Sequence, residues 1–89
     1  MLSWVSGLFE RAPCDHLPAS APEPASDGCQ ECGQHFSLRL CGTCGHVGCC
    51  ETSRGHARDH AGATGHPIIY SMPVGRGFAW CYVEGRYVR

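Results

Sequence analysis

The stretch CQECGQHFSLRLCGTCGHVGCCETSRGHARDHAGATGH, residues 29–66, decides the fold of this chain. It contains two C-x-x-C pairs, Cys29/Cys32 and Cys41/Cys44, followed by further cysteines and histidines. Two intervening residues bring both sulfurs of a pair onto one face of a metal ion, and thiolates with imidazoles suit Zn²⁺. The stretch therefore predicts a fold that is held together by zinc.

The sequence offers enough candidate ligands for two zinc ions. Beyond the two pairs, the chain offers Cys49 or Cys50 and three histidines, His56, His60 and His66. Because structural zinc takes four ligands, two complete sites are predicted. Spacing alone does not say which residues share an ion. His56 and His60 stand four residues apart and would share a helix face, so the simplest assignment places both on one metal.

A third, weaker set of ligands lies outside this stretch. Cys14 and His16 form a C-x-H pair, and Cys81 stands far along the chain. These three residues leave a fourth position unfilled, and Glu84 could fill it with a carboxylate oxygen. A third zinc site with mixed ligands is therefore a candidate.

Length and composition agree with a single domain that needs metal. The chain has 89 residues, of which 8 are cysteine and 6 are histidine. So short a chain buries little surface and usually needs disulfides or metal for stability. It leaves no room for a two-domain enzyme, and no segment approaches the roughly 20 apolar residues of a membrane-spanning helix. A net charge of -1 argues against nucleic-acid binding.

The context of the cysteines favours zinc over disulfides. Residues 1–9 (MLSWVSGLF) are apolar but lack the basic start of a signal peptide, so we expect a cytoplasmic protein. In a reducing cytosol, thiols stay available for metal. All 7 basic residues are arginine, and glycine and alanine are plentiful, which suggests a GC-rich bacterial genome.

The chain is expected to divide into an apolar N-terminal segment, residues 1–13, and one domain, residues 14–89. A short amphipathic helix is predicted near the start from the helical spacing of Val5, Leu8 and Phe9. Residues 17–28 (LPASAPEPASDG) are rich in proline, alanine and serine, which predicts a mobile loop.

The domain is predicted to be a small α+β fold, with one short helix packed on a sheet of three to four strands. The helix is expected over residues 54–61, with Thr52 or Ser53 as its N-cap and Gly62 at its end. Alternating or β-branched runs predict the strands, at residues 36–40, 67–72, 78–83 and 86–88.

The order of these residues resembles the UBP-type zinc finger, the ubiquitin-recognising module of ubiquitin-specific proteases and some deacetylases. The resemblance rests on C-D-H at 14–16, C-x-x-C-G at 29–33, C-x-x-C at 41–44, Cys49, G-H at 55–56, His60, G-H-P at 65–67 and W-C-Y at 80–82. It covers residues 14–88. The stretches L-C-x-x-C-G-H-V-G-C-C and W-C-Y-V are most similar to those of short, stand-alone bacterial members.

The resemblance implies cross-braced zinc sites, in which the two helix histidines serve different ions. The first ion would take Cys29, Cys32, Cys49 and His56, and the second would take Cys41, Cys44, His60 and His66. The family's third zinc uses a C-x-H pair and a late C-x-x-C pair, whose last cysteine is replaced here. That set would be Cys14, His16, Cys81 and Glu84.

Three residues fall outside these ligand sets. Cys50 is expected to be a packed thiol, and His35 and His46 are expected to lie on the surface or beside a ligand. Asp59 precedes a ligand histidine and could orient its imidazole, or it could simply be a solvated carboxylate.

In the family, an aromatic pocket captures the free C-terminal Gly-Gly of ubiquitin. Trp80, Tyr82 and Tyr87 align with its aromatic residues, although they could instead simply cover the small core. The family also has an arginine after the third cysteine of the first site, where this chain has Glu51. A carboxylate there repels a carboxylate terminus, so we expect a different protein or peptide tail as the partner. An arginine from elsewhere could reach the same place; the candidates are Arg54, Arg58 and Arg76.

The predicted function is a non-catalytic zinc-binding module. A catalytic zinc keeps an open position, whereas both central sites have complete ligand sets. The sequence also lacks the H-E-x-x-H, G-x-S-x-G, P-loop and zinc-deaminase motifs. Two alternatives stay open. One is a redox or zinc-buffering protein, suggested by the adjacent Cys49 and Cys50, and the other is a nucleic-acid-binding zinc module.

Overall fold

The computed structural model of the chain describes residues 13–89. This part of the chain contains, in order, β1 (Leu38–Cys41), β2 (Val47–Cys49), α2 (His56–Thr64), β3 (Ile68–Ser71), β4 (Ala79–Cys81) and β5 (Arg86–Val88). None of the helices described has the length and apolar character needed to cross a bilayer. The amphipathic helix predicted near the start of the chain lies outside the described residues.

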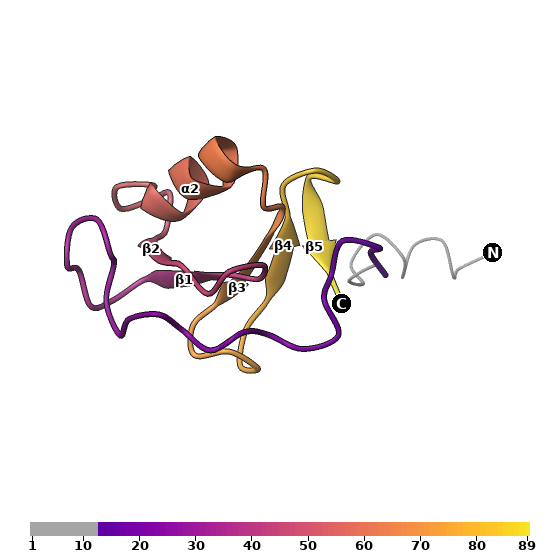
Figure 1. The fold of residues 1–89 in the computed structure, drawn as a ribbon, viewed down its shortest axis with the longest axis horizontal. Coiled ribbons are helices and arrows are strands. Elements are labelled where there is room, and N and C mark those ends of the chain that lie inside the picture. The colour runs from indigo at the N-terminus through magenta and orange to yellow at the C-terminus, as the bar shows by residue number, and fades with distance from the viewer. Residues whose placement is uncertain (1–12) are drawn as a thin grey trace.

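The strands form one antiparallel sheet in the order β2-β1-β3-β4-β5, and α2 lies over one face of it (Figure 1). The predicted α+β class, with one short helix on a small sheet, is confirmed. The sheet has five strands rather than the three to four expected. The unpredicted strand is β2, whose sequence Val47-Gly48-Cys49 is short and has a glycine at its centre. Glycine is depleted in strands, so nothing in this run indicates one.

The helix lies two to three residues further along the chain than predicted. Gly55 is its N-cap, in the left-handed conformation with φ 71°, and neither Thr52 nor Ser53 caps it. Gly62 lies inside the helix, which ends instead at Gly65 with φ 79°. Glycine adopts positive φ at little cost and commonly ends helices in this way. The correction matters because it places His56, a candidate metal ligand, at the first helical residue.

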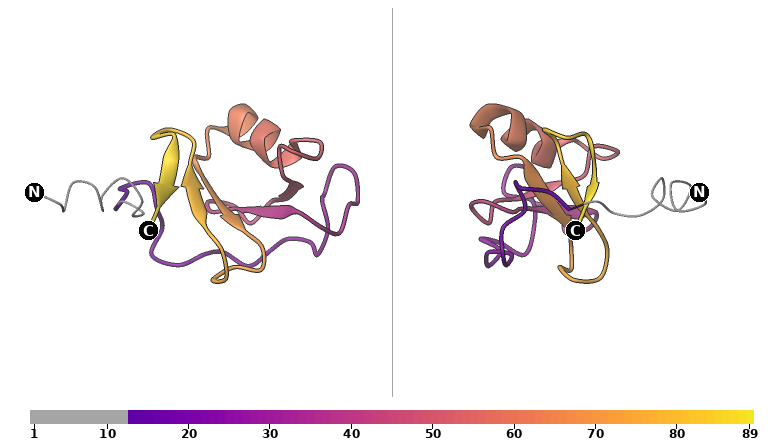
Figure 2. Two further views of the ribbon diagram at one scale, coloured as in Figure 1. Left: turned by 180° about the vertical axis from the view of Figure 1, so that it is seen from behind. Right: turned by 90° about the vertical axis from the view of Figure 1, so that its right-hand side faces the viewer.

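One face of the sheet carries the hydrophobic core, because side chains alternate along each strand. Its buried members are Cys29, Leu38, Leu40, Val47, Cys49, Ile68, Ala79, Cys81 and Val88. The chain before β1 runs along this face, opposite α2, without helix or strand (Figure 2). Leu17 and Ala21 pack on the core from this segment, and the Ala25 N–H donates to the Gly45 carbonyl at 2.9 Å. Mobility of residues 17–28 stays a prediction.

On the opposite face, α2 packs chiefly against β1 and β2. The close approach of the helix depends on Gly48, since a Cβ there would lie 2.6 Å from the Ala57 nitrogen. The buried side chains of α2 are Ala57 and Ala61, both small. The part of this face formed by β3, β4 and β5 is left open beside the helix, and Trp80 and Tyr87 pair across it.

Candidate metal centres and aromatic pocket

Three turns of the same geometry present the candidate metal ligands. Each begins with a cysteine whose carbonyl accepts a hydrogen bond from the N–H of a glycine four residues later, at 2.7 to 3.0 Å. The pairs are Cys29 with Gly33, Cys41 with Gly45 and Cys81 with Gly85. All three glycines have positive φ, which favours glycine over other residues. The third turn therefore repeats the C-x-x-C-G turn, with Glu84 in place of the second cysteine.

The first cluster brings together Cys29, Cys32, Cys49 and His56, whose ligand atoms all lie within 4.8 Å of one another. Nδ1 of His56 is 3.3 Å from Sγ of Cys29 and 3.4 Å from Sγ of Cys49. In a tetrahedral site with Zn–S of about 2.3 Å and Zn–N of about 2.0 Å, sulfur and nitrogen lie about 3.5 Å apart. The donor set and its spacing fit a zinc ion.

The second cluster consists of Cys41, Cys44, His60 and His66. Sγ of Cys41 lies 3.5 Å from Nδ1 of His66, and Sγ of Cys44 lies 3.3 Å from Nε2 of His60. The simple assignment of both helix histidines to one metal is wrong, because the two ends of the β1–β2 hairpin face successive turns of α2. The grouping is the cross-braced one that the family resemblance implied.

The third cluster joins the two ends of the described chain through Cys14, His16, Cys81 and Glu84. Oε2 of Glu84 lies 2.8 Å from Sγ of Cys14 and 3.2 Å from Nδ1 of His16. The other carboxylate oxygen accepts hydrogen bonds from the Arg86 guanidinium, one of them at 2.9 Å from Nε. Because Arg86 binds one carboxylate oxygen of Glu84, a single oxygen is left to face the cluster. Nη2 of Arg86 also donates a hydrogen bond to the Pro13 carbonyl.

The thiols of the clusters have perturbed pKa values. Burial raises the pKa of Cys29, but the N–H groups of Cys32 and Glu31 outweigh it and lower the pKa to about 6. Burial and the neighbouring Glu84 raise the pKa of Cys14 to about 11. Metal ligation requires the thiolate, so a bound divalent cation favours the deprotonated form in each cluster and releases protons.

Cys50, His35 and His46 belong to none of the three clusters. His35 is exposed, and Cys50 is buried, as expected of a packed thiol. The ring of His46 stacks on that of His60, with centroids 3.9 Å apart and planes within 2°. Its Nε2 lies 2.9 Å from Oε2 of Glu31. His46 is therefore a neighbour of the second cluster.

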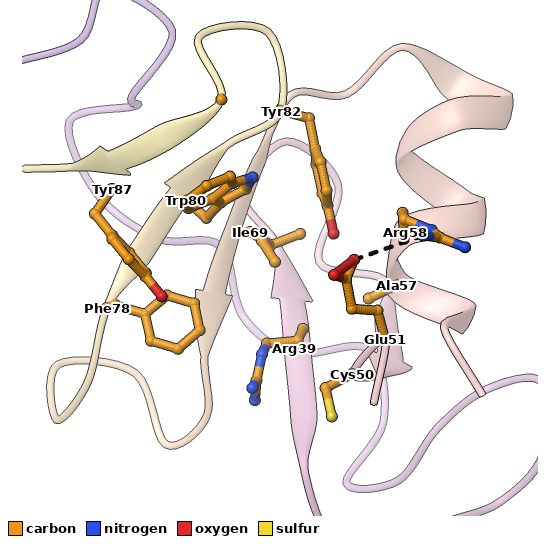
Figure 3. Close-up of a pocket in the computed structure, with 11 residues that line it drawn as sticks. Arg39, Cys50, Glu51, Ala57, Arg58, Ile69, Phe78, Trp80, Tyr82 and Tyr87 are labelled. Carbon is orange, nitrogen blue, oxygen red and sulfur yellow. Dashed lines mark ion pairs between the residues drawn. The ribbon is translucent and has the colours of Figure 1, made fainter. Parts of the chain in front are cut away.

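A cavity of about 470 Å³ opens between α2 and the uncovered part of the sheet (Figure 3). Trp80, Tyr82 and Tyr87 all line it, and Phe78 joins them. The Tyr87 ring packs edge-to-face against Trp80 at 4.9 Å and against Phe78 at 5.1 Å. Such contacts hold aromatic rings in defined orientations. Tyr87 is nevertheless 49% exposed, so the pocket presents a preformed aromatic surface to solvent.

Glu51, which stands where the family's arginine was expected, lines the same pocket. Its Oε2 lies 3.7 Å from Nη1 of Arg58, and both side chains are more than half exposed. Burial and then the charge of Glu51 raise the pKa of Tyr82, whose hydroxyl points toward Glu51 in Figure 3. Of the three arginines considered from the sequence, Arg58 lines the pocket, and Arg54 and Arg76 do not.

Arg39 is a pocket residue that the sequence reasoning missed. Its guanidinium carbon lies 5.0 Å from the centre of the Phe78 ring, and its Nη1 donates to the Leu38 carbonyl at 2.9 Å. The alternation of β1 was the available signal: Leu38 and Leu40 point to the core, so Arg39 points to the opposite face. Nothing in the sequence indicated that this face holds the pocket.

Comparison of the sequence with known protein families agrees with the three Cys/His clusters. Residues 29–89 match the family described as "Zn-finger in ubiquitin-hydrolases and other protein". The chain belongs to this family. The resemblance drawn from the order of cysteines and histidines is thereby confirmed. Family and clusters together support a zinc-binding module.

The relatives of this zinc finger include much longer proteins. The BRCA1-associated proteins of Mus musculus and Homo sapiens are 37% identical to it over 68 residues, which make up 75% of this chain and 11% of each relative. The chain thus spans about a tenth of their length. A protein from Rhodopseudomonas palustris, solved by solution NMR, is 40% identical with a TM-score of 0.75, over 89% of this chain and 83% of that one.

Proposed function

We propose that this chain is a non-catalytic module that holds zinc at all three clusters and recognises a protein or peptide tail in its aromatic pocket. Its similarity to the Rhodopseudomonas palustris protein supports a bacterial origin, and a cytoplasmic location agrees with the unpaired thiols of the described residues.

The zinc ions act as structural supports in this proposal. Each cluster offers four donors, as a closed structural site requires, and a catalytic site keeps one position for water or substrate. The hydrophobic core is small, so metal binding supplies much of the folding free energy. Native mass spectrometry of the purified chain should find three zinc ions. A stoichiometry of two in the presence of excess zinc would remove the third site from the proposal.

The proposed recognition role rests on the aromatic pocket. Trp80, Tyr82 and Tyr87 combine large apolar surfaces with polar edges, the composition typical of binding hot spots. The sheet and α2 hold them in place before any ligand arrives, which lowers the entropic cost of binding. An extended tail fits such an open, preformed groove better than a folded surface does.

This chain lacks the arginine with which the family meets the ubiquitin tail. Glu51 presents a carboxylate in that place, and a carboxylate terminus would meet repulsion there. We therefore expect weak binding of the ubiquitin tail in that mode, and a different tail as the natural partner.

A binding screen tests the recognition role. Zinc-loaded protein is screened against N-acetylated random heptapeptides, and against ubiquitin with its tail intact or truncated. Peptides that bind the wild type should lose binding to Trp80→Ala, and also to Tyr87→Ala, which changes a half-exposed ring and spares the core. Zinc content confirms that each variant is folded. If peptides bind both variants as well as they bind the wild type, the pocket is not the recognition site.

A further inference from the structure

The side chains that line the aromatic pocket include more arginines than carboxylates. Two arginines, Arg39 and Arg58, and one carboxylate, Glu51, contribute side chains to it. Glu51 and Arg58 form an ion pair at 3.7 Å on the rim, where both are more than half exposed. With the Cys50 thiol neutral, the lining is left with one net positive charge, that of Arg39.

Arg39 makes none of the ion pairs found among residues 13–89. One of its N–H groups donates to the Leu38 carbonyl at 2.9 Å, and its guanidinium lies 5.0 Å from the centre of the Phe78 ring. A guanidinium has five N–H donors, so most of them are left for a ligand. The backbone contact and the ring together hold the group in place, which reduces the entropy lost when an anion binds.

We propose that Arg39 is the residue that selects the ligand of this pocket, by binding the terminal carboxylate of the recognised tail. The inference rests on the proposed tail recognition and adds to it the residue and the charge of the ligand. A single free guanidinium suits a monoanion, and its planar fork matches a carboxylate. Glu51 in the same pocket disfavours a dianion such as a phosphate monoester. In Figure 3, Arg39 lies beside Phe78 at one edge of the pocket, so the rest of the tail can cross the aromatic surface.

The position of this cation distinguishes the chain from the arrangement that its family resemblance implied. Position 51 is a glutamate, and the free positive charge comes from β1 instead. The ligand terminus would then lie beside Arg39 rather than at position 51. Glu51 should weaken the binding of an acidic terminus through space, and Arg39 should strengthen it.

The test uses the heptapeptides of the screen in three forms: free C-terminal acid, C-terminal amide, and amide with one internal glutamate. Binding of the free acids should fall about tenfold or more on amidation, and by a similar factor in Arg39→Gln, since a charge-assisted hydrogen bond is lost. Glu51→Gln should strengthen binding of the acids by about twofold, and leave the amides unchanged. Arg76→Gln, outside the pocket, controls for the loss of one positive charge.

The outcomes separate this inference from the proposed function. Binding that needs Trp80 but is indifferent to both amidation and Arg39→Gln overturns the role of Arg39 and leaves tail recognition standing. Binding of the internal-glutamate amides as tightly as of the acids overturns the assignment to a terminal carboxylate. Absence of any Trp80-dependent binding, in a protein with full zinc content, overturns both.

A different observation points to a positioning residue of the second cluster. A metal-bound histidine usually donates its second ring N–H to an acceptor, which fixes the orientation of the ring. Nε2 of His60 faces the cluster, and no acceptor within residues 13–89 bonds its other nitrogen; Asp59 does not supply one. The parallel ring of His46, 3.9 Å away, is what contacts His60 instead.

The geometry points to His46 as the group that orients His60, with Glu31 holding His46 in place. The side chain of His46 is only 12% exposed, and Glu31 lies between Cys29 and Cys32 of the first cluster. The three side chains thus connect the turn of one cluster to a ligand of the other. Removal of the stacked ring should leave His60 free to rotate and should weaken metal binding at the second cluster alone.

Cobalt substitution tests this role. Co²⁺ bound by the three thiolates of the first cluster differs in absorption from Co²⁺ bound by two. The second and third clusters both offer two thiolates, so the variants are made in a Cys14→Ser background, which removes a ligand of the third cluster. His46→Ala should weaken Co²⁺ binding at the second cluster about tenfold and shift its d–d bands, and His46→Phe, which keeps a stacked ring, should restore part of the affinity. His35→Ala is the matched control at an exposed histidine. An unchanged affinity and spectrum in His46→Ala would overturn the role.

Discussion

Substitution of Gly48 by alanine should weaken two zinc sites at once, although Gly48 binds no metal. The new Cβ would lie 2.6 Å from the nitrogen and 2.8 Å from the Cα of Ala57. These are backbone atoms of α2, so no side-chain rotation can relieve the contact. Ordinary contact begins at 3.4 Å, and α2 would therefore have to move away from the sheet by about 1 Å.

A movement of this size exceeds what the clusters tolerate. Metal–ligand distances vary by about 0.2 Å, and α2 carries one histidine of each central cluster, His56 and His60. Overpacking of this kind costs about 1–3 kcal/mol. Because metal binding and folding are coupled, we expect the combined affinity for the two ions to fall by about 5- to 150-fold, shared between both clusters.

Competition with a chromophoric zinc chelator measures this loss, and Gly62→Ala is the matched control. Gly62 lies inside α2, and a Cβ there would meet no atom within 4 Å. Alanine at this position should stabilise the helix by about 0.5–1 kcal/mol. If Gly48→Ala binds zinc within twofold of the wild type while Gly62→Ala behaves as expected, the helix is not held by close packing on β2.

Three further predictions concern the metal. Chelation of zinc by excess EDTA should abolish the β-sheet signal in circular dichroism, and zinc should restore it; a folded apo-protein would contradict the structural role. Glu84→Cys should strengthen the third site and Glu84→Gln should weaken it, as measured by the zinc retained in native mass spectrometry against a fixed chelator concentration. Arg86→Gln should lower third-site affinity about tenfold by releasing the second carboxylate oxygen of Glu84, and no change would show that Glu84 needs no such support.

The grouping of the metal ligands was the part of the structure that residue order could predict. Cysteine and histidine at metal-ligand spacing have few other uses in so short a chain, and the family resemblance then chose among the pairings. The strands at Ile68–Ser71 and Arg86–Val88 were predicted to within two residues, because β-branched and aromatic residues dominate them.

The features that were missed depend on contacts between distant segments. β2 is a strand because it pairs with β1, and its Gly48 allows α2 to lie close to it, a constraint that no local pattern expresses. The N-cap is Gly55 and not a hydroxyl residue. Arg39 enters the pocket only because β1 and β4 flank β3, which places its guanidinium beside Phe78. Local propensity does not contain such neighbours, and only the assembled sheet shows them.

The interleaving of the ligands has a consequence for how the protein is made. A chain growing from its N-terminus completes the first cluster at His56, the second at His66 and the third only at Glu84. Cys41 and Cys44, half of the second cluster, lie within the segment that the first cluster closes. No fragment that ends before residue 66 contains the ligands of two clusters, so the coupled folding of the two central clusters must wait until the chain has passed His66. For the same reason, recombination can transfer this domain between genes only as a whole.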